Sequence, residues 1–315
     1  MTIKIFTNEV AGGWNPLDLK DGLGGSEESI ILFSEALVRK GYQISVFHTQ
    51  KENHSSEYNG VHYFPREAAK CNLDDIFITF KDNIPWVNQA KGKVNIHWTA
   101  DVERPWNTDR IDHFVNLSFF HAQRNLWVSP RKSKIIPLGI DLDSLNHHKQ
   151  EKNENLMLYC SAPDRGLEQL LRDWENIRKY YSGLELAICY GNESNSLYSL
   201  YSLLGQDGIK VLGRVTKAII EELYWKAKYW CLPLNRADSE LFCLNAVKAQ
   251  YCGAIPVVNK IGALKNTVRS YIPYDNFVKG QIRKNDINIE YEPSMIAMDW
   301  DHIVETYWLP LFGGK

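Results

Sequence analysis

The sequence has little of what marks secreted, membrane-spanning or nucleic-acid-binding proteins. Its six cysteines are scattered, without a Cys-x-x-Cys pair, which predicts buried free thiols in a reducing compartment rather than disulfides or a zinc site. No window approaches the roughly eighteen apolar residues of a membrane span, and the N-terminus has no signal-peptide pattern. A formal net charge of -2 gives no bulk attraction to nucleic acid. We therefore expect a cytoplasmic protein without a transmembrane segment or a nucleic-acid partner.

What the sequence does have is enough apolar material for substantial cores. The chain has 315 residues, of which 44% are hydrophobic and 12% aromatic. This length is typical of two domains of ordinary size. The polar run 147–155 has almost nothing to bury and is the obvious linker. We therefore predict domains over 1–146 and 147–298, followed by a terminal helix over 299–315.

The hydrophobic patterning alternates between strand and helix in both halves. In the first half we predict strands at 2–7, 44–47, 75–80, 93–98 and 112–118, with helices at 26–39, near 85–90 and from Phe119. In the second half we predict strands at 156–160, 184–190, 210–212, 230–234 and 255–258, with helices ending near Tyr181 and spanning 216–228. Regular alternation of this kind predicts two doubly wound parallel sheets of the α/β class.

The stretch 238–258 is the most informative part of the chain. Asp238 or Ser239 is a candidate N-cap for a helix that Gly253 ends, followed by a short apolar strand. The backbone amides of Phe242 and Cys243 would lie at the positive end of that helix. Such an end is a ready site for an anion such as a diphosphate.

Polar side chains also gather where the predicted strands of the second half end. These residues are Ser161, Arg165, Tyr190, Arg214 and Glu240. Ligands of doubly wound sheets bind outside the carboxyl ends of the strands. We therefore expect these five side chains to line a ligand site.

The segment Glu-x-Phe, then a helix, then Ala-x-x-x-Gly-x-Pro-Val-Val resembles the donor-site segment of GT-B glycosyltransferases, in particular the GT4-like group. Glu240 and Gly253 have the spacing of that family. The family's second glutamate, which usually holds the nucleotide ribose, is replaced by Lys248. A lysine cannot accept the ribose hydroxyl protons as a carboxylate does. Lys248 would instead contact phosphate or point to solvent, and the first alternative implies altered nucleotide recognition.

Other segments carry the same resemblance. The loop glycines Gly24 and Gly25, followed by Ser26, match the family's first strand-to-helix turn, and Arg165 matches a basic residue that contacts the donor diphosphate. The turn 136–141 resembles the family's Ile-Pro-Asn-Gly-Ile-Asp segment, with Leu138 in place of asparagine. The tail 299–312 resembles the terminal helix that packs back on the N-terminal domain.

The family's sugar-facing histidine has two possible counterparts. His97 stands at the end of a predicted strand, where a packed structural histidine is about equally expected. The related His-Asp motif aligns equally well with Asp101, which leaves Ala100 in the place of the histidine. Both alignments stay open at this point.

The resemblance implies a GT-B architecture, with two Rossmann-like domains facing a cleft, and a retaining, metal-independent hexosyl- or pentosyltransferase. Its partners would be a nucleotide-diphosphate sugar and a carbohydrate or glycoconjugate acceptor, with no cofactor. The implied catalytic residues are Glu240, His97 and Asp101. The implied donor-binding residues are Gly24, Gly25, Ser26, Ser161, Arg165, Tyr190, Arg214, Glu240, Leu241, Phe242, Cys243, Leu244 and Lys248.

Three other functions compete with this interpretation. A GT-A transferase would need an Asp-x-Asp metal motif, but the triplets 141–143 and 299–301 are better explained as an interdomain turn and a helix cap. A nucleotide-sugar epimerase would bind the same donor on the same fold. A degenerate GT-B module would bind glycan or nucleotide without turnover, and Lys248 favours this alternative.

Overall fold

The computed structural model describes residues 2–7, 10, 12–51, 55–69, 73, 75–81, 91–101, 108–190, 199–237, 240–282 and 298–313. The helix predicted near 85–90, the candidate caps Asp238 and Ser239, and Cys71 lie outside these ranges. The chain forms two compact units. The first comprises 1–19, 23–141 and 298–315, and the second comprises 20–22 and 142–297.

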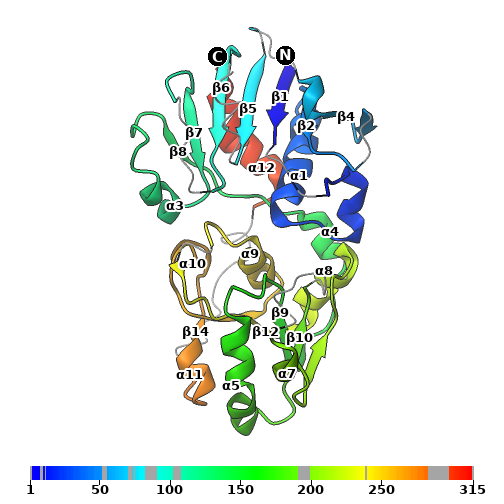
Figure 1. The fold of residues 1–315 in the computed structure, drawn as a ribbon, viewed down its shortest axis with the longest axis vertical. Helices are drawn as coiled ribbons and strands as arrows, with labels where there is room; N and C mark the ends of the chain where they lie inside the picture. The colour runs from blue at the N-terminus through cyan, green and yellow to red at the C-terminus, as the bar shows by residue number, and fades with distance from the viewer. Residues whose placement is uncertain are drawn as a thin grey trace. The chain divides into compact units, whose positions relative to one another are not determined.

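The first unit is a sheet covered by helices (Figure 1). Its elements are β1 (Thr2–Phe6), α1 (Gly25–Arg39), β2 (Gln43–His48), β3 (Ser56–Tyr58), β4 (Val61–Pro65), β5 (Ile76–Phe80), β6 (Val94–Trp98), β7 (His113–Asn116), α3 (Phe119–Arg124), β8 (Ser133–Ile135) and α12 (Trp300–Ile303). Short 3-10 turns lie at Pro16–Asp21, of which residues 20 and 21 belong to the second unit, and at Arg66–Ala68. The strand order is β3-β4-β2-β1-β5-β6-β7-β8, and every pair except β3–β4 is parallel.

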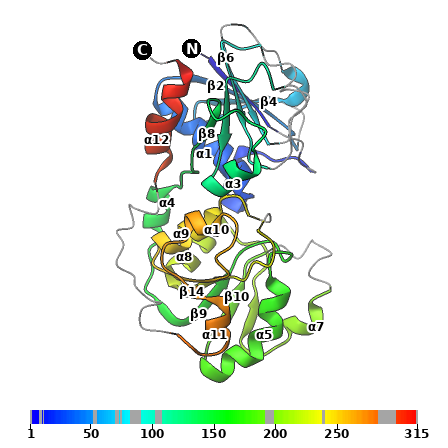
Figure 2. The same ribbon diagram turned by 90° about the vertical axis from the view of Figure 1, so that its left-hand side faces the viewer.

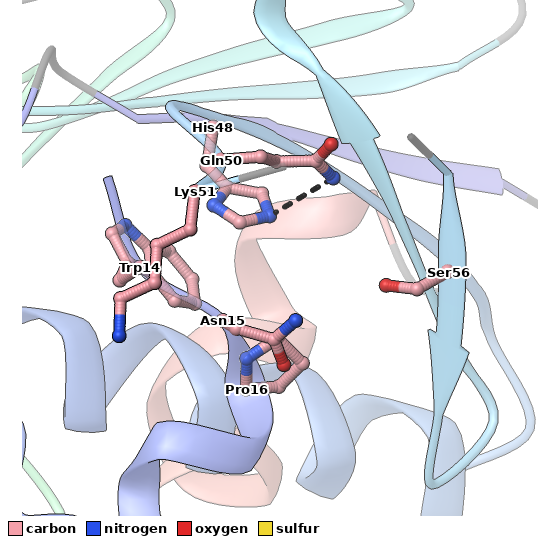
Figure 3. A pocket seen from close by; sticks show the side chains of 7 residues that line it. All are labelled: Trp14, Asn15, Pro16, His48, Gln50, Lys51 and Ser56. Carbon is pink, nitrogen blue, oxygen red and sulfur yellow. Dashed lines mark hydrogen bonds between the residues drawn. The ribbon is translucent and has the colours of Figure 1, made fainter. Parts of the chain in front are cut away.

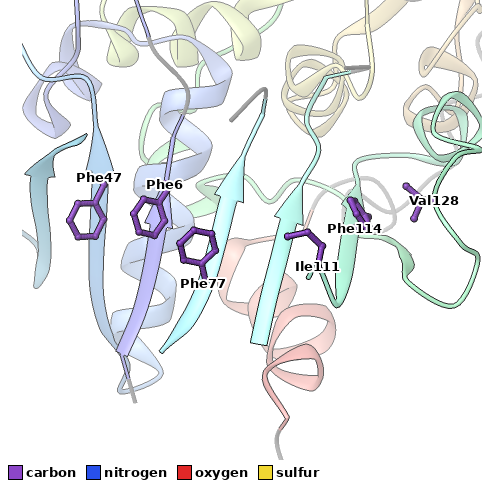
Figure 4. Close-up of a cluster of buried hydrophobic side chains, with 6 residues drawn as sticks. All are labelled: Phe6, Phe47, Phe77, Ile111, Phe114 and Val128. Atoms are coloured by element: carbon purple, nitrogen blue, oxygen red, sulfur yellow. The ribbon is translucent and has the colours of Figure 1, made fainter. Parts of the chain in front are cut away.

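One face of this sheet is lined with aromatic side chains. Phe47, Phe6 and Phe77 are buried on the neighbouring strands β2, β1 and β5, and Phe114 is buried on β7, beyond β6 (Figure 4). The rings of Phe6 and Phe47 stack with centroids 4.8 Å apart. Parallel strands buried on both faces favour such continuous apolar sequences.

The second unit repeats the parallel α/β plan. Its elements are α4 (Leu142–His147), β9 (Asn153–Tyr159), α5 (Leu167–Tyr180), β10 (Glu185–Ile188), α7 (Tyr201–Leu204), β11 (Ile209–Val211), α8 (Lys217–Lys226), β12 (Ala227–Leu232), α9 (Leu244–Tyr251), β13 (Ile255–Val258), α10 (Leu264–Thr267), β14 (Ile272–Pro273) and α11 (Tyr274–Val278). The strand order is β11-β10-β9-β12-β13-β14, with all pairs parallel. The predicted class of two parallel α/β sheets is thus confirmed.

The C-terminal segment returns to the first unit, as predicted. After α12, a π-helical turn (Val304–Trp308) and a 3-10 turn (Leu309–Phe312) complete the segment, which lies beside α1 in Figure 2. The Trp308 ring packs on Phe33 of α1 with centroids 4.5 Å apart and on Trp98 of β6 at 5.0 Å. Asp299 caps α12 by accepting a hydrogen bond from the His302 amide at 2.7 Å, the role expected for that triplet.

The helix of the 238–258 stretch begins later than predicted. α9 starts at Leu244, and its N-cap is Cys243, so the assignment of the cap to Asp238 or Ser239 was wrong. Cys243 has a left-handed φ of 70°, a conformation that costs a residue with a Cβ roughly 1–2 kcal/mol. The helix ends as expected, with Gly253 just beyond it at φ 78°.

Two further expectations concern membrane-spanning helices and disulfides. Within the described residues, no helix is long and apolar enough to cross a membrane. The five described cysteines are free of disulfides, and four of them are buried, whereas Cys160 is half-buried.

Candidate active site

An ion pair between Arg165 and Glu240 forms the centre of the site in the second unit. Arg165 lies in the loop between β9 and α5, and its Nη1 donates a hydrogen bond to Glu240 Oε2. The Glu240 side chain is only 13% exposed. Burial raises the pKa of Glu240, while the Arg165 guanidinium and the Cys243 amide act against that rise. The two residues were predicted to lie at one sheet edge, and the structure brings them into contact.

The second carboxylate oxygen of Glu240 closes the turn before α9. Glu240 Oε1 accepts a hydrogen bond from the Cys243 amide at 3.0 Å. The sequence-based expectation that the Cys243 amide is free for an anion was therefore wrong. A carboxylate three residues earlier already occupies it, as an acidic group at a helix N-terminus is favoured to do.

Hydrogen bonds hold the Arg165 loop against α9. Asn245 Nδ2 donates to the Cys160 carbonyl oxygen at 2.6 Å, and the Tyr224 hydroxyl donates to Asn245 Oδ1 at 2.8 Å. Gly166 follows Arg165 with φ 94°, and a Cβ at this position would lie 2.2 Å from the Pro233 carbonyl oxygen. Only glycine permits this close approach of the loop to Pro233.

Lys248 does not point to solvent. It lies in the middle of α9 and is 6% exposed, which excludes the solvent-facing alternative. Its charge acts on two thiols, because Lys248 lowers the pKa of Cys160 and of Cys252 against the larger raising effect of burial. The lysine is therefore directed into the protein from the same helix that Glu240 precedes.

The remaining candidate residues of the second unit are more dispersed. Ser161 is buried in the Arg165 loop, and Tyr190 is half-buried just after β10. Arg214 Nη1 donates to the Gly22 carbonyl oxygen at 3.0 Å. Among residues 241–244, Leu241 is half-buried, whereas Phe242, Cys243 and Leu244 are buried.

In the first unit, His97 is packed at the carboxyl end of β6. It is 1% exposed, and its Nδ1 is hydrogen-bonded to the Thr79 hydroxyl at 2.7 Å. Burial, reinforced by nearby His121, lowers the pKa of His97 to about 3, so the ring is neutral. The Phe114 ring lies edge-on to it at 5.9 Å.

Asp101 is held by a histidine that the sequence analysis missed. His121 Nδ1 accepts from the Leu117 amide at 3.2 Å, and Nε2 lies 2.6 Å from the Asp101 carbonyl oxygen. Because a backbone amide only donates, Nδ1 carries no proton and Nε2 donates to Asp101. The sequence signal was Ser118, which caps α3 through the His121 amide and so fixes the histidine on the first turn.

The glycine pair of the first unit lies at the start of α1. Gly24 is the N-cap, with φ -67°, and Gly25 is the first helical residue. Both are exposed, and Ser26 beside them is half-buried. Gly24 has an ordinary φ, so backbone conformation does not require glycine there, and a Cβ at this position would lie 2.4 Å from Glu27 Oε2.

No group of three or more potential metal ligands occurs among the described residues. The two aspartates of the triplet 299–301 have other partners: Asp299 caps α12, and Asp301 pairs with Arg39 at 3.0 Å.

Comparison with known proteins found a family match for part of the second unit. Residues 143–282 match the family model "Glycosyl transferases group 1". No curated protein sequence matched the chain.

Solved structures share the whole fold at low identity. The chain is similar to sucrose-phosphate synthase from Thermosynechococcus elongatus, with a TM-score of 0.70, 13% identity and 100% of each chain covered. It is similar to Anabaena HepE in complex with UDP-glucose, with a TM-score of 0.69, 10% identity and 100% of each chain covered. The glycosyltransferase WaaG, of lipopolysaccharide biosynthesis, matches with a TM-score of 0.64 and 11% identity over 99% of this chain and 100% of that one. The GT-B fold expected from the sequence is thus confirmed.

Proposed function

We propose that the chain, whose residues 143–282 match the glycosyltransferase group 1 family, transfers a sugar from a nucleotide-diphosphate sugar to a hydroxyl acceptor. The donor would be held by 147–298 and the acceptor by 1–146, with 299–315 supporting the latter. Retention of anomeric configuration is proposed from the family alone. The free cysteines support a reducing, cytoplasmic setting for the reaction.

The observation that carries this proposal is the Arg165–Glu240 pair at the start of α9. The barrier to glycosyl transfer is charge separation between an oxocarbenium-like sugar and a departing diphosphate, so the protein must stabilise negative charge on the leaving group. Arg165 has five N–H donors, and Glu240 Oε2 accepts from Nη1. The remaining donors suit phosphate oxygens, and Glu240 fixes the plane of the guanidinium. The Arg165 guanidinium would thus supply positive charge for a metal-independent reaction.

Glu240 would also contact the hydroxyls of the donor sugar, as the family resemblance implies. Its carboxylate already holds Arg165 and the Cys243 amide, so the sugar would meet a carboxylate whose position is set in advance. A group held in place before substrate binds loses less freedom when it contacts the transition state.

Lys248 supports an altered nucleotide grip. A buried ammonium near the Cys160 loop cannot accept the ribose hydroxyl protons, but it attracts phosphate. We therefore propose that the diphosphate, rather than the ribose, contributes most of the donor affinity. Lys248→Glu should change the preference among nucleotides or their affinity, and an unchanged nucleotide profile would refute this altered grip.

A thermal-shift panel with UDP, GDP, ADP, CDP and TDP, with and without EDTA, tests the proposed function. A nucleotide at about 100 times its dissociation constant stabilises the native state by roughly 2.7 kcal/mol, which shifts the melting temperature by several degrees. A shift with one nucleotide that persists in EDTA, together with release of that nucleotide from its sugar conjugate, supports the transferase. A shift that disappears in EDTA contradicts the metal-independent reaction.

A degenerate binding module is the second candidate, because Lys248 replaces a family acid and Glu240 is already paired. Such a module would bind nucleotide or glycan without releasing product. Nucleotide release that depends on an added acceptor excludes it, and release of an epimerised donor without acceptor would instead identify an epimerase.

A further inference from the structure

The turn that follows β6 in the first unit has a strained backbone. Ala100 has a φ of 27°, and the Asp101 amide on one side of it donates to the Thr99 carbonyl oxygen on the other. A three-residue turn that is closed in this way with a positive central φ is rare and strained. Such a conformation costs a residue with a Cβ roughly 1–2 kcal/mol, whereas glycine adopts it freely. The sequence nevertheless has alanine at this position.

Only a few of the described residues are strained in this way. Besides Ala100, the non-glycine residues with positive φ are Asn59, Lys81 and Cys243. Asn59 lies in the hairpin turn between β3 and β4, where asparagine is usual, and Cys243 belongs to the site of the second unit. Lys81 and Ala100 come after β5 and β6, which are neighbours in the sheet. Strained residues persist where surrounding contacts fix them, and they cluster at functional sites.

Two side chains fix this turn at its two ends. At one end, the Thr99 amide and hydroxyl both donate to the Val115 carbonyl oxygen of β7, at 3.0 Å and 2.8 Å. At the other end, His121 Nε2 donates to the Asp101 carbonyl oxygen at 2.6 Å. His121 is fully buried, and its Nδ1 accepts from the Leu117 amide. The imidazole therefore joins the residue that follows β7 to the turn that follows β6.

These contacts permit one form of the His121 ring. A proton on Nδ1 would face the Leu117 N–H, so the ring is neutral, with its proton on Nε2. Burial also lowers the pKa of His121, and the hydrogen bond to Asp101 opposes this effect. His48, another buried histidine of this unit, differs, because its Nε2 lies 3.4 Å from the amide nitrogen of Gln50 in the same segment (Figure 3). Through this nitrogen His48 joins no second strand, whereas His121 does.

We propose that His121 is a positioning residue, which keeps the turn 99–101 in the strained shape that Asp101 uses to bind a hydroxyl of the carbohydrate acceptor. This proposal rests on the proposed transferase function for the role of Asp101 and for the ligand. Ala100 and Asp101 are half-buried, so the turn reaches the surface at the carboxyl edge of the sheet, where doubly wound folds bind ligands. A turn that is fixed in advance loses less freedom when the acceptor binds, and this advantage offsets the strain.

Nuclear magnetic resonance of the full chain with nitrogen-15 in its histidines tests the form of the ring. The chain has 9 histidines, and the variant His121→Gln identifies the His121 signals by their loss. We expect an unprotonated Nδ1 and a protonated Nε2. A proton on Nδ1 would mean that the Leu117 amide is not bound by this ring, and it would overturn the proposal.

The backbone amide signals of the full chain test the role of the turn. Glucose is the probe, without nucleotide, and we expect it to move the signals of Ala100 and Asp101. His121→Leu removes both hydrogen bonds of the ring and should raise the dissociation constant of glucose about tenfold. His121→Gln should stay within about twofold of the unaltered protein, because a glutamine amide can accept from Leu117 and donate to Asp101. If glucose moves neither signal, the turn contacts no carbohydrate and the proposal fails.

Two further variants separate positioning from a general loss of stability. His48→Leu replaces another buried histidine of the same unit and should leave the affinity for glucose unchanged. Ala100→Gly relieves the strain, so the melting temperature should not fall, but the freer turn should bind glucose about threefold more weakly. This variant leaves the core intact and therefore tests the proposal even if His121→Leu does not fold. Equal weakening by the two leucine variants, or unchanged affinity in Ala100→Gly, would refute the positioning role.

Failure of this proposal and failure of the proposed function are distinguishable. The nucleotide shift tests the second unit and needs no glucose, whereas the Ala100 and Asp101 signals test the first unit in the absence of nucleotide. A protein that binds a nucleotide but leaves these two signals unchanged still fits the proposed transferase, with its acceptor contacts elsewhere.

Discussion

Arg165 is the residue whose charge the proposed reaction depends on most directly. Replacing it with alanine removes the guanidinium that we propose stabilises the leaving group, and loss of one such stabilising donor costs about 10²–10³ in kcat. We expect Arg165→Ala to reduce the rate of nucleotide release by this factor.

Arg172→Ala is the matched control, because Arg172 is exposed on α5 and pairs with Glu168 of the same helix. Its turnover should equal that of the unaltered protein. Equal rates for the two variants would show that Arg165 contributes nothing to the chemistry.

The buried histidines predict a loss of stability in acid. His97 and His48 have folded-state pKa values of about 3 and about 4, lowered by burial from the ordinary 6.5. Between pH 6.5 and these values the unfolded chain binds protons that the folded chain does not, so the free energy of unfolding falls as the pH falls. Thermal unfolding of the first unit should show this slope, and His97→Gln should flatten it. His62→Gln, an exposed substitution, should leave the slope unchanged.

At the same scale, the sequence identified the site residues more readily than their contacts. Arg165 and Glu240 were found because both follow predicted strands, and parallel strands end at one edge. Their direct pairing was not predictable, because it joins residues 75 positions apart. His121 was missed because its role depends on a contact from α3 to the Asp101 carbonyl oxygen, 20 positions away in the sequence.

At the scale of elements, the turn between β9 and α5 depends on Gly166. Gly166→Ala would place a Cβ 2.2 Å from the Pro233 carbonyl oxygen at a φ of 94°. We expect this variant to lower the free energy of unfolding of the second unit by about 2 kcal/mol or more, measured by urea or heat. Gly205→Ala is the control, because no atom lies within 4 Å of its added Cβ and its φ is -78°. A neutral Gly166→Ala would mean that the loop moves away from Pro233 at little cost.

The start of α9 shows where helix rules based on sequence stop working. A cap was expected at Asp238 or Ser239 because such side chains commonly begin helices. The helix instead begins at Leu244, since the Glu240 carboxylate reaches the Cys243 amide and holds Cys243 in a left-handed conformation. The start of α9 therefore depends on the ion pair between Glu240 and Arg165. Rules based on local sequence preference do not take such a contact into account.

At the scale of the whole molecule, the returning C-terminal segment is part of the core of the first unit. Trp308 is fully buried against Phe33 and Trp98. Trp308→Ala should destabilise the first unit by about 3–5 kcal/mol, the range for a large aromatic lost from a core. Differential scanning calorimetry should show one transition shifted down and the transition of the second unit unchanged. Thr306→Ala, an exposed change in the same segment, should shift neither.

The same returning segment constrains how the protein is made. The face of α1 and β6 around Phe33 and Trp98 is covered by residues 298–313, but 156 residues of the second unit, 142–297, are translated in between. At ordinary elongation rates this interval lasts roughly 8–30 s. During that time the second unit is translated, and the aromatic surface of the first unit stays uncovered. The nascent chain is therefore a natural client for chaperones that bind hydrophobic surfaces, and a stalled or truncated product should aggregate through its N-terminal half.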